Sequence, residues 1–231
     1  MTWTSAVGRG CRAILHKIVH GLALTKVNPN YLTFLGLVIN VGAALLFGYA
    51  AGDYQARLFR YAGLVIIGAG IFDMVDGRVA RATGQVTEFG GFFDSVIDRY
   101  SDVVLYFGLL VYYARANRFF YVVLTAIVMV TSVMVSYTRA RAECLIPKCK
   151  VGFMERPERI VLVIIGALFN RMAPVLWVIA VIGNISVIHR IVYTYQQTRT
   201  RDLAKITEAV STVTSSQSPD SPQSSVVSRQ A

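Results

Sequence analysis

The sequence contains little charge for a protein of its length. Only 16% of its 231 residues are charged, whereas 55% are hydrophobic, and the mean hydropathy is +0.52. Soluble globular domains usually carry about 25% charged residues. Three cysteines, a small and odd number in a chain this long, exclude a secreted disulfide scaffold. The composition also excludes collagen-like and wholly disordered chains, so it predicts an integral membrane protein.

Three stretches lack any charged residue and are long enough to cross a bilayer as helices. They hold 26, 20 and 18 residues and lie between Lys26 and Asp53, Arg118 and Arg139, and Arg171 and Arg190. Three shorter runs, 61–72, 103–114 and 160–170, reach spanning length only if neighbouring charged residues also enter the membrane. Each such residue costs roughly 2.5 to 3.5 kcal/mol, so a chain that keeps several usually needs them for function.

We therefore predict an all-α integral membrane protein with six transmembrane helices, preceded by an interfacial helix. The predicted spans are approximately 31–51, 60–80, 93–114, 119–139, 157–170 and 173–194. An even number of spans puts both termini on one side, and 17 of the 23 basic residues lie on that side. The positive-inside rule then predicts cytoplasmic termini and a multi-pass protein of the cell (inner) membrane. Membrane lipids account for the basic charge, and nucleic acid is not needed as a partner.

Two segments flank the predicted six-helix domain, residues 31–195. In residues 1–30, Ile14, Ile18 and Leu22 recur every four positions among basic residues, which is typical of a cytoplasmic juxtamembrane amphipathic helix. Residues 196–231 form a cytoplasmic tail. Ser, Gln, Pro and Thr dominate it from about residue 211, so we predict disorder from there onward.

Two pairs of aspartates stand at helical spacing beside the second and third predicted spans. Asp73 and Asp76 are three residues apart, and Asp94 and Asp98 are four apart, so each pair shares a helix face. A short, glycine-containing connection would hold the two helices antiparallel and bring the pairs together. Four converging carboxylates repel one another, and two Mg²⁺ ions, or Mn²⁺, would remove that repulsion. Paired metal ions are a recurrent device for displacement at phosphorus.

The residues around these aspartates suit the same chemistry. Gly77 and Ala80 leave room for a nucleotide or diphosphate, and Arg81 offers a planar donor for phosphate oxygens. Asp98 could take the proton of an attacking alcohol as a general base. Asp102 extends the stripe by one turn, and we interpret it as a supporting residue or an arginine partner.

Together these positions form a pattern that resembles a known family signature. Written out, Asp73-x2-Asp76-Gly77-x2-Ala80-Arg81-x8-Gly90-x3-Asp94-x3-Asp98 is similar to the complete signature of the CDP-alcohol phosphotransferases. The resemblance extends to the six-span layout and the segment 28–33. It implies Mg²⁺- or Mn²⁺-dependent transfer of a phosphatidyl-type group from a CDP-linked lipid to an alcohol, with release of CMP. It also suggests a homodimer.

The resemblance implies a role for each matching residue. Metal binding falls to Asp73, Asp76, Asp94 and, in our assignment, Asp98, which is also the proposed catalytic base. The CDP-lipid site comprises Asp73, Asp76, Gly77, Ala80, Arg81 and Thr33.

The fourth predicted cytoplasmic stretch and the end of the last span are rich in arginine. The candidates for one cytoplasmic cavity are Arg139, Arg141, Arg156, Arg159 and Arg190. An acceptor with its own phosphate would require such a cluster, whereas a neutral alcohol would not. Segments 136–143, 152–159 and 189–192 resemble the acceptor side of phosphatidylinositol phosphate synthases of bacteria and archaea, although Arg139 stands where lysine is expected. This implies transfer from CDP-diacylglycerol to inositol 1-phosphate, with the five arginines binding the acceptor's phosphate.

Several alternatives remain open at the level of sequence. Glycerol 3-phosphate is the nearest alternative acceptor. The aspartates could instead form structural salt bridges with Arg78, Arg81 and Arg99, and the basic loop could bind lipid headgroups. An intramembrane prenyltransferase would need a second aspartate-rich motif, and none follows Asp102. An ion or proton transporter would not explain the fixed spacing of Gly77, Ala80 and Arg81.

Overall fold

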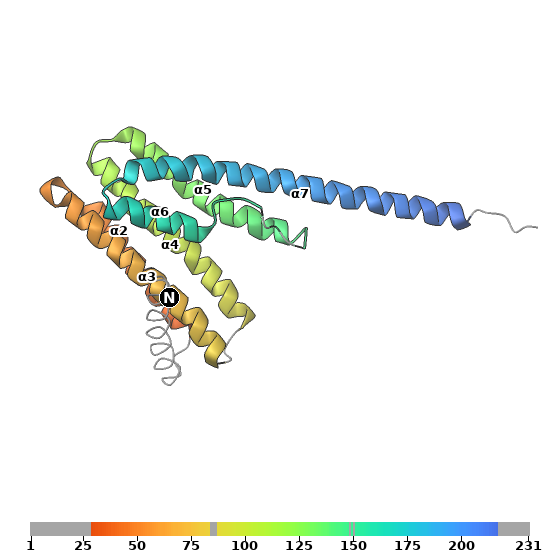
Figure 1. Ribbon diagram of the computed structural model, residues 1–231, viewed down its shortest axis with the longest axis horizontal. Coiled ribbons are helices and arrows are strands. Elements are labelled where there is room, and N and C mark those ends of the chain that lie inside the picture. Colours follow the sequence, from red (N-terminus) through yellow and green to blue (C-terminus); the bar gives the residue numbers. More distant parts are fainter. Residues whose placement is uncertain (1–28, 84–86, 148, 150, 217–231) are drawn as a thin grey trace, which may run out of the picture.

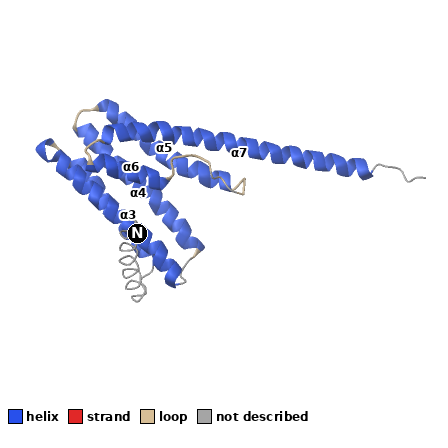
Figure 2. Ribbon diagram, in the orientation of Figure 1, coloured by secondary structure: helices blue, strands red, loops and turns tan. Residues whose placement is uncertain are grey.

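The chain is built from helices. The computed structural model describes residues 29–83, 87–147, 149 and 151–216, without the side chains of residues 29, 75–83 and 210–216, and every regular element in that part is helical (Figure 2). The elements are α2 (Pro29–Tyr49), the 3-10 turn η1 (Gly52–Tyr54), α3 (Gln55–Thr83), α4 (Glu88–Arg115), α5 (Phe119–Glu143), α6 (Arg156–Leu168) and α7 (Met172–Ser216). The predicted all-α class is confirmed for these residues. The predicted amphipathic helix in 1–30 lies outside them, apart from the start of α2.

Three of the helices have the length and apolar composition needed to cross a membrane. They are Asn30–Tyr49, Phe119–Glu143 and Met172–Ala209, with mean hydropathies of 1.9, 2.2 and 2.0. They correspond to the first, fourth and sixth predicted spans. Helices α3, α4 and α6 correspond to the other three, but α3 and α4 carry charged residues and α6 has only 13 residues. Membrane crossing by these three helices stays a prediction.

The last helix is longer than the sequence analysis predicts. The sixth predicted span, 173–194, lies within α7, which continues as one 45-residue helix to Ser216 and extends away from the bundle (Figure 1). No glycine or proline lies between Gly183 and Pro219 to end it. The tail predicted to be disordered from about 211 is therefore helical through Ser216, and its remainder lies outside the described residues.

The six α-helices of the described residues pack as a closed ring of neighbours. Helix α2 contacts α3 and α4, α4 contacts α5, α5 contacts α7, α7 contacts α6, and α6 returns to α3. One apolar cluster joins them and includes Phe47, Phe59, Leu109, Val163 and Leu176, all almost fully buried. With this apolar part closed, the charged segments of α3, α4 and α6 meet on one side of the ring.

Close packing between α2 and α4 depends on a glycine. A Cβ atom added at Gly108 of α4 would lie 2.7 Å from the Cα atom of Ala44 in α2, which is closer than side-chain atoms pack. The two backbones therefore touch directly, as small residues allow in membrane helices. This contact sets where α4, and the aspartates at its start, lie relative to α2.

We expect Gly108→Ala to destabilise the protein, because the added methyl group must push α4 away from Ala44. Overpacking of this kind costs about 1 to 3 kcal/mol, which would lower the midpoint of thermal unfolding in detergent. Gly42→Ala in α2 is the matched control, because a Cβ atom there meets nothing within 4 Å. A Gly108→Ala protein as stable as the control would contradict the backbone contact.

Candidate active site

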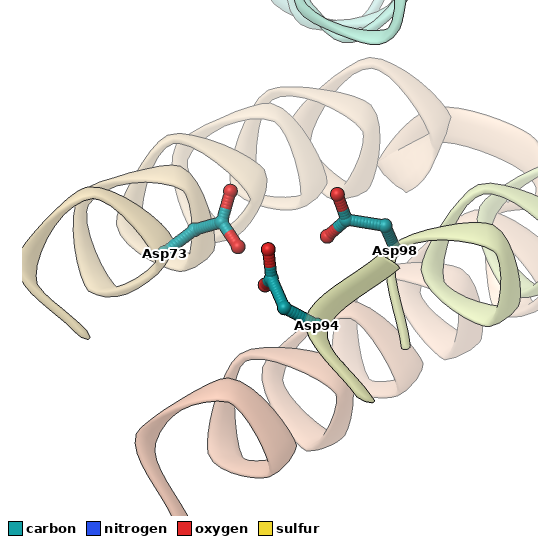
Figure 3. A group of neighbouring side chains, drawn as sticks. All are labelled: Asp73, Asp94 and Asp98. Carbon is teal, nitrogen blue, oxygen red and sulfur yellow. The ribbon is translucent and has the colours of Figure 1, made fainter. Parts of the chain in front are cut away.

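Three aspartates from two helices converge. Asp73 of α3 and Asp94 and Asp98 of α4 each contribute a carboxylate oxygen to a group in which all three atoms lie within 4.8 Å of one another (Figure 3). Asp94 and Asp98 are one turn apart on α4, so they present to α3 together. The structure thus brings together three of the four predicted carboxylates. For Asp76, Gly77, Ala80 and Arg81 the structure describes only the backbone, which continues α3.

The guanidinium of Arg156 faces this cluster. Arg156, the first residue of α6, places its Nη1 atom 3.0 Å from Asp73 Oδ2 and 2.8 Å from Asp98 Oδ1. Within the described part of the chain it is the one cation paired with either aspartate. Among the described side chains, three carboxylates face one guanidinium and offer hard oxygen donors. That donor set suits a divalent cation such as Mg²⁺ or Mn²⁺.

Behind Arg156 lies a buried ion pair. Asp102 of α4 is 3% exposed and accepts hydrogen bonds from Arg159 Nη2 at 2.7 Å and from Ser132 Oγ at 2.8 Å. Arg159 is 0% exposed and also donates to the carbonyl oxygen of Met154. The interpretation of Asp102 as an arginine partner is confirmed. Asp102 Oδ1 lies 3.6 Å from Arg156 Nε, so it supports Arg156 on the side away from Asp73.

Arg99 does not pair with an aspartate in the described structure. Its Nη1 donates to the carbonyl oxygen of Ser95 at 2.7 Å, one turn back on α4. The alternative interpretation of the aspartates as structural salt bridges named three arginines. Arg99 does not support it, and the side chains of Arg78 and Arg81 lie outside the described residues.

Two cavities meet at the aspartates. The first, of about 360 Å³, lies among α2, α3, α4 and α6 and is mostly apolar, with Thr33, Asp73, Asp98 and Arg156 among its polar lining residues. The second, of about 390 Å³, lies among α4, α5, α6 and α7 and is lined by charged side chains. Asp98, Arg156 and Pro157 line both. An apolar and a charged compartment therefore share one wall, and an aspartate stands in it.

The structure gathers four of the five predicted arginines around the second cavity. They are Arg139, Arg156, Arg159 and Arg190. The fifth does not reach it, because Arg141 projects from α5 into a different hollow with Tyr137 and Tyr195. Arg159 lines the cavity, but its guanidinium is committed to Asp102 rather than turned to solvent. The prediction that five arginines line one cavity is therefore corrected for Arg141, which lines another hollow, and for Arg159, which pairs with Asp102. The physical reason is that the packing of α5 and α6 turns Arg141 away from the cavity and the guanidinium of Arg159 toward Asp102.

Arg190 and Arg139 are held in different ways. Arg190 is 1% exposed and donates to the carbonyl oxygens of Val135 and Val151. Gly152 adjoins it with a φ of +104°, and a Cβ atom there would approach Arg190 Nε to 3.0 Å. Glycine is required at this place both by its backbone conformation and by the room that Arg190 needs. Arg139 is more exposed and pairs with Glu143 at 3.2 Å and Glu155 at 2.5 Å.

Two site residues escape the sequence analysis. Glu155 lies in the arginine-lined cavity, and the signal that could have found it is an acidic residue directly before Arg156 in a predicted anion site. Asn40 is buried in the wall of the apolar cavity, and among the described residues its Oδ1 atom has no hydrogen-bond partner. Its signal is an amide in the middle of a charge-free span, where polar groups are costly.

Comparisons with known proteins agree with this geometry. The family model of CDP-alcohol phosphatidyltransferase matches residues 26–196. The archaetidylinositol phosphate synthase of Pyrococcus horikoshii is 34% identical over 178 residues, which cover 77% of this chain and 88% of that protein. The phosphatidylinositol phosphate synthase of Mycobacteroides abscessus is 33% identical over 185 residues, covering 77% and 81%.

Solved structures give the same result for the fold. The phosphatidylinositol phosphate synthase of Mycobacterium tuberculosis with CDP-DAG bound superposes with a TM-score of 0.70 at 31% identity, covering 79% of this chain and 94% of that one. The same enzyme in complex with manganese and citrate gives 0.67 at 31% identity, covering 78% and 88%. This chain therefore belongs to the CDP-alcohol phosphatidyltransferase family and is an enzyme of that class.

Proposed function

We propose that the protein transfers the phosphatidyl group of CDP-diacylglycerol to inositol 1-phosphate, giving phosphatidylinositol phosphate and CMP. The observation that carries this proposal is the shared wall of the two cavities, in which Asp98 and Arg156 face both an apolar and an arginine-lined compartment. A lipid donor and a phosphorylated acceptor need these two environments side by side. The names of the relatives at 33% and 34% identity, a phosphatidylinositol phosphate synthase and an archaetidylinositol phosphate synthase, both support an inositol phosphate product, and the first also supports the phosphatidyl group.

The apolar cavity is the proposed donor site. Exposed apolar side chains such as Ile71 and Val161 line it, so a lipid can enter from the bilayer with its acyl chains against them. The diphosphate would lie beside Thr33 and Asp73, which also line this cavity. By family resemblance, Gly77, Ala80 and Arg81 on the next turns of α3 would contact the CDP portion. A relative's structure with CDP-DAG bound supports this donor.

The aspartates would hold the metal ions. We assign two Mg²⁺ ions, with Mn²⁺ as the alternative, to Asp73, Asp76, Asp94 and Asp98. Bound there, the ions would offset the charge of the diphosphate and of the departing CMP. A relative's complex with manganese supports a divalent metal in this family.

Asp98 is the proposed base because it reaches both compartments. Its carboxylate takes the proton of the acceptor hydroxyl as the hydroxyl oxygen forms a bond to the phosphatidyl phosphorus. The bond between that phosphorus and the oxygen bridging to CMP breaks, and CMP leaves with the electron pair. Arg156, paired with Asp98 at 2.8 Å, keeps the carboxylate in the wall between the two substrates.

The arginine-lined cavity is the proposed acceptor site. Arg139, Arg156 and Arg190 supply its donors, and Arg159 acts from behind by holding Asp102 against Arg156. Guanidinium groups favour phosphate because they offer paired donors in a plane. We further propose that this cavity and both termini face the cytoplasm, in line with the distribution of basic residues. The homodimer that the family resemblance suggests stays a prediction.

The acceptor assignment is tested with a panel of alcohols. Purified protein with CDP-diacylglycerol and Mg²⁺ should release CMP with inositol 1-phosphate and far more slowly with free inositol, which lacks the phosphate that the arginines bind. Glycerol 3-phosphate carries a phosphate but a different alcohol. Equal turnover with free inositol or with glycerol 3-phosphate would contradict the assignment.

Asp98→Asn should reduce CMP release by about 100-fold or more, because general-base catalysis typically contributes 10² to 10⁴ in rate. The amide keeps the size of the side chain but cannot accept the hydroxyl proton. Asp53→Asn, an exposed residue of η1 away from both cavities, is the control and should leave the rate unchanged. A fully active Asp98→Asn enzyme would rule out Asp98 as the base.

Arg139→Gln should raise KM for inositol 1-phosphate by about tenfold or more, since a hydrogen bond to a charged group is worth about 1.5 to 3 kcal/mol. The value of kcat should change less. Arg141→Gln is the matched control, because Arg141 lies two residues further along α5 and lines a different hollow. Its KM should stay within about twofold of the wild-type value. Equal effects of the two substitutions would show that the basic loop acts by overall charge alone.

A further inference from the structure

A carboxylate of the protein itself lies where the acceptor's phosphate is expected. Glu155 places Oε1 2.5 Å from Arg139 Nη1 and 4.0 Å from Arg190 Nη2. It therefore stands between two guanidinium groups that come from different helices, α5 and α7. The first turn of α6, whose backbone N–H groups also favour negative charge, lines the same cavity.

The position of Glu155 in the chain does not require this contact. Glu155 is the N-cap residue of α6, where a carboxylate commonly accepts a hydrogen bond from the helix backbone, yet its side chain makes no such bond. The side chain turns instead toward Arg139 and is 42% exposed. The carboxylate is thus available to move without loss of a helix cap.

Arg190 has one hydrogen-bond donor without a partner among the described residues. Its Nε and Nη1 atoms donate to backbone carbonyl oxygens, whereas its buried Nη2 atom has no hydrogen-bond partner among the described residues. Glu155, 4.0 Å away, is too distant to bond it. Carbonyl groups satisfy donors but do not neutralise the guanidinium charge. An anion larger than a carboxylate could reach both Arg139 and Arg190 Nη2.

We propose that Glu155 is a specificity-determining residue, an internal anion that competes with the acceptor's phosphate for Arg139 and Arg190. The proposal rests on the assignment of the arginine-lined cavity to the acceptor. A phosphate dianion carries more charge and more acceptor oxygens than one carboxylate, so it displaces Glu155. Singly charged anions and neutral alcohols do not. Glu155 therefore weakens phosphate binding somewhat and in return excludes weaker anions.

Two roles for Glu155, competition with phosphate and support of Arg139, predict opposite changes in phosphate affinity when Glu155 is neutralised. If Glu155 competes, its neutralisation strengthens phosphate binding, because the arginines are released. If Glu155 only holds Arg139 in a binding conformation, the same change weakens phosphate binding. Glu155→Gln separates the two, since the amide keeps the shape of the side chain and removes the charge.

The first measurement needs no turnover. Inorganic phosphate is titrated into detergent-purified protein, and its half-saturating concentration is read from the rise in the thermal unfolding midpoint. We expect that concentration to fall about two- to fivefold in Glu155→Gln, as loss of a partly exposed ion pair implies. Glu158→Gln is the matched control. It removes the same charge from the same helix, but Glu158 is exposed and lines another hollow with Phe153 and Val178.

The second measurement tests selectivity. In Glu155→Gln, KM for inositol 1-phosphate should fall by a similar factor, with a smaller change in kcat. Acetate should inhibit the variant more strongly than the wild type, because no internal carboxylate opposes it. Glu155→Asp keeps the charge on a shorter side chain, so its KM for inositol 1-phosphate should lie between those of the wild type and Glu155→Gln. It replaces Glu155→Gln if that variant does not fold.

An unchanged or raised half-saturating phosphate concentration in Glu155→Gln, relative to Glu158→Gln, would overturn the proposal. An absence of CMP release with inositol 1-phosphate would instead overturn the proposed function. The phosphate titration would still decide the role of Glu155, because it reports anion binding to the arginines without any reaction.

Discussion

The guanidinium of Arg156 is the contact on which the rest of the site depends. It pairs with Asp73 of α3 and Asp98 of α4 on one side and lies 3.6 Å from Asp102 on the other. Charged groups in a partly buried setting are costly unless they are paired. Arg156 thereby ties the start of α6 to α3 and α4, and it offsets part of the repulsion among the carboxylates described there. It also forms the wall between the two cavities, so one interaction fixes both the helices and the compartments.

The ring of helices explains how a 13-residue helix can hold this position. Helix α6 contacts α3 on one side and α7 on the other, and its buried Arg159 reaches Asp102 of α4. A buried ion pair of this kind adds little net stability but costs about 3 to 5 kcal/mol to break from one side, so it fixes the register of α6. Elsewhere in the ring, the direct contact of Gly108 with Ala44 fixes the position of α4 relative to α2. The apolar parts of the helices build the ring, and the polar pairs set its register.

The sequence predicts those features of the fold and of the site that depend on residues close together in the chain. Charge-free runs predict α2, most of α5 and the first part of α7, and the four-residue spacing of Asp94 and Asp98 predicts their shared face. The end of α7 was missed because composition suggested a tail where no residue actually stops the helix. The different pairing of Arg156 with Asp98 and of Arg159 with Asp102 was also missed. Arg156 and Arg159 stand three residues apart, and which of them turns toward Asp102 depends on α4 and α5, which spacing along α6 does not reveal.

The arginines also differ in how far nearby carboxylates neutralise their charge. This difference indicates which of them can attract an anion. Arg159 is paired with buried Asp102 at 2.7 Å, so it adds little net charge to the cavity. Arg156 is outnumbered by the carboxylates around it. Arg190 is held by backbone carbonyls, which satisfy its donors and leave its charge nearly intact. A buried cation that is hydrogen-bonded but not neutralised attracts an anion more strongly than one already paired. Among the described residues that line this cavity, Arg190 and Arg99 therefore keep the least neutralised charge, because Arg139 already pairs with Glu143 and Glu155. Arg190 lies on α7 and the aspartates lie on α3 and α4, so part of the charge proposed to bind an acceptor is separate from the carboxylate proposed to act on its hydroxyl.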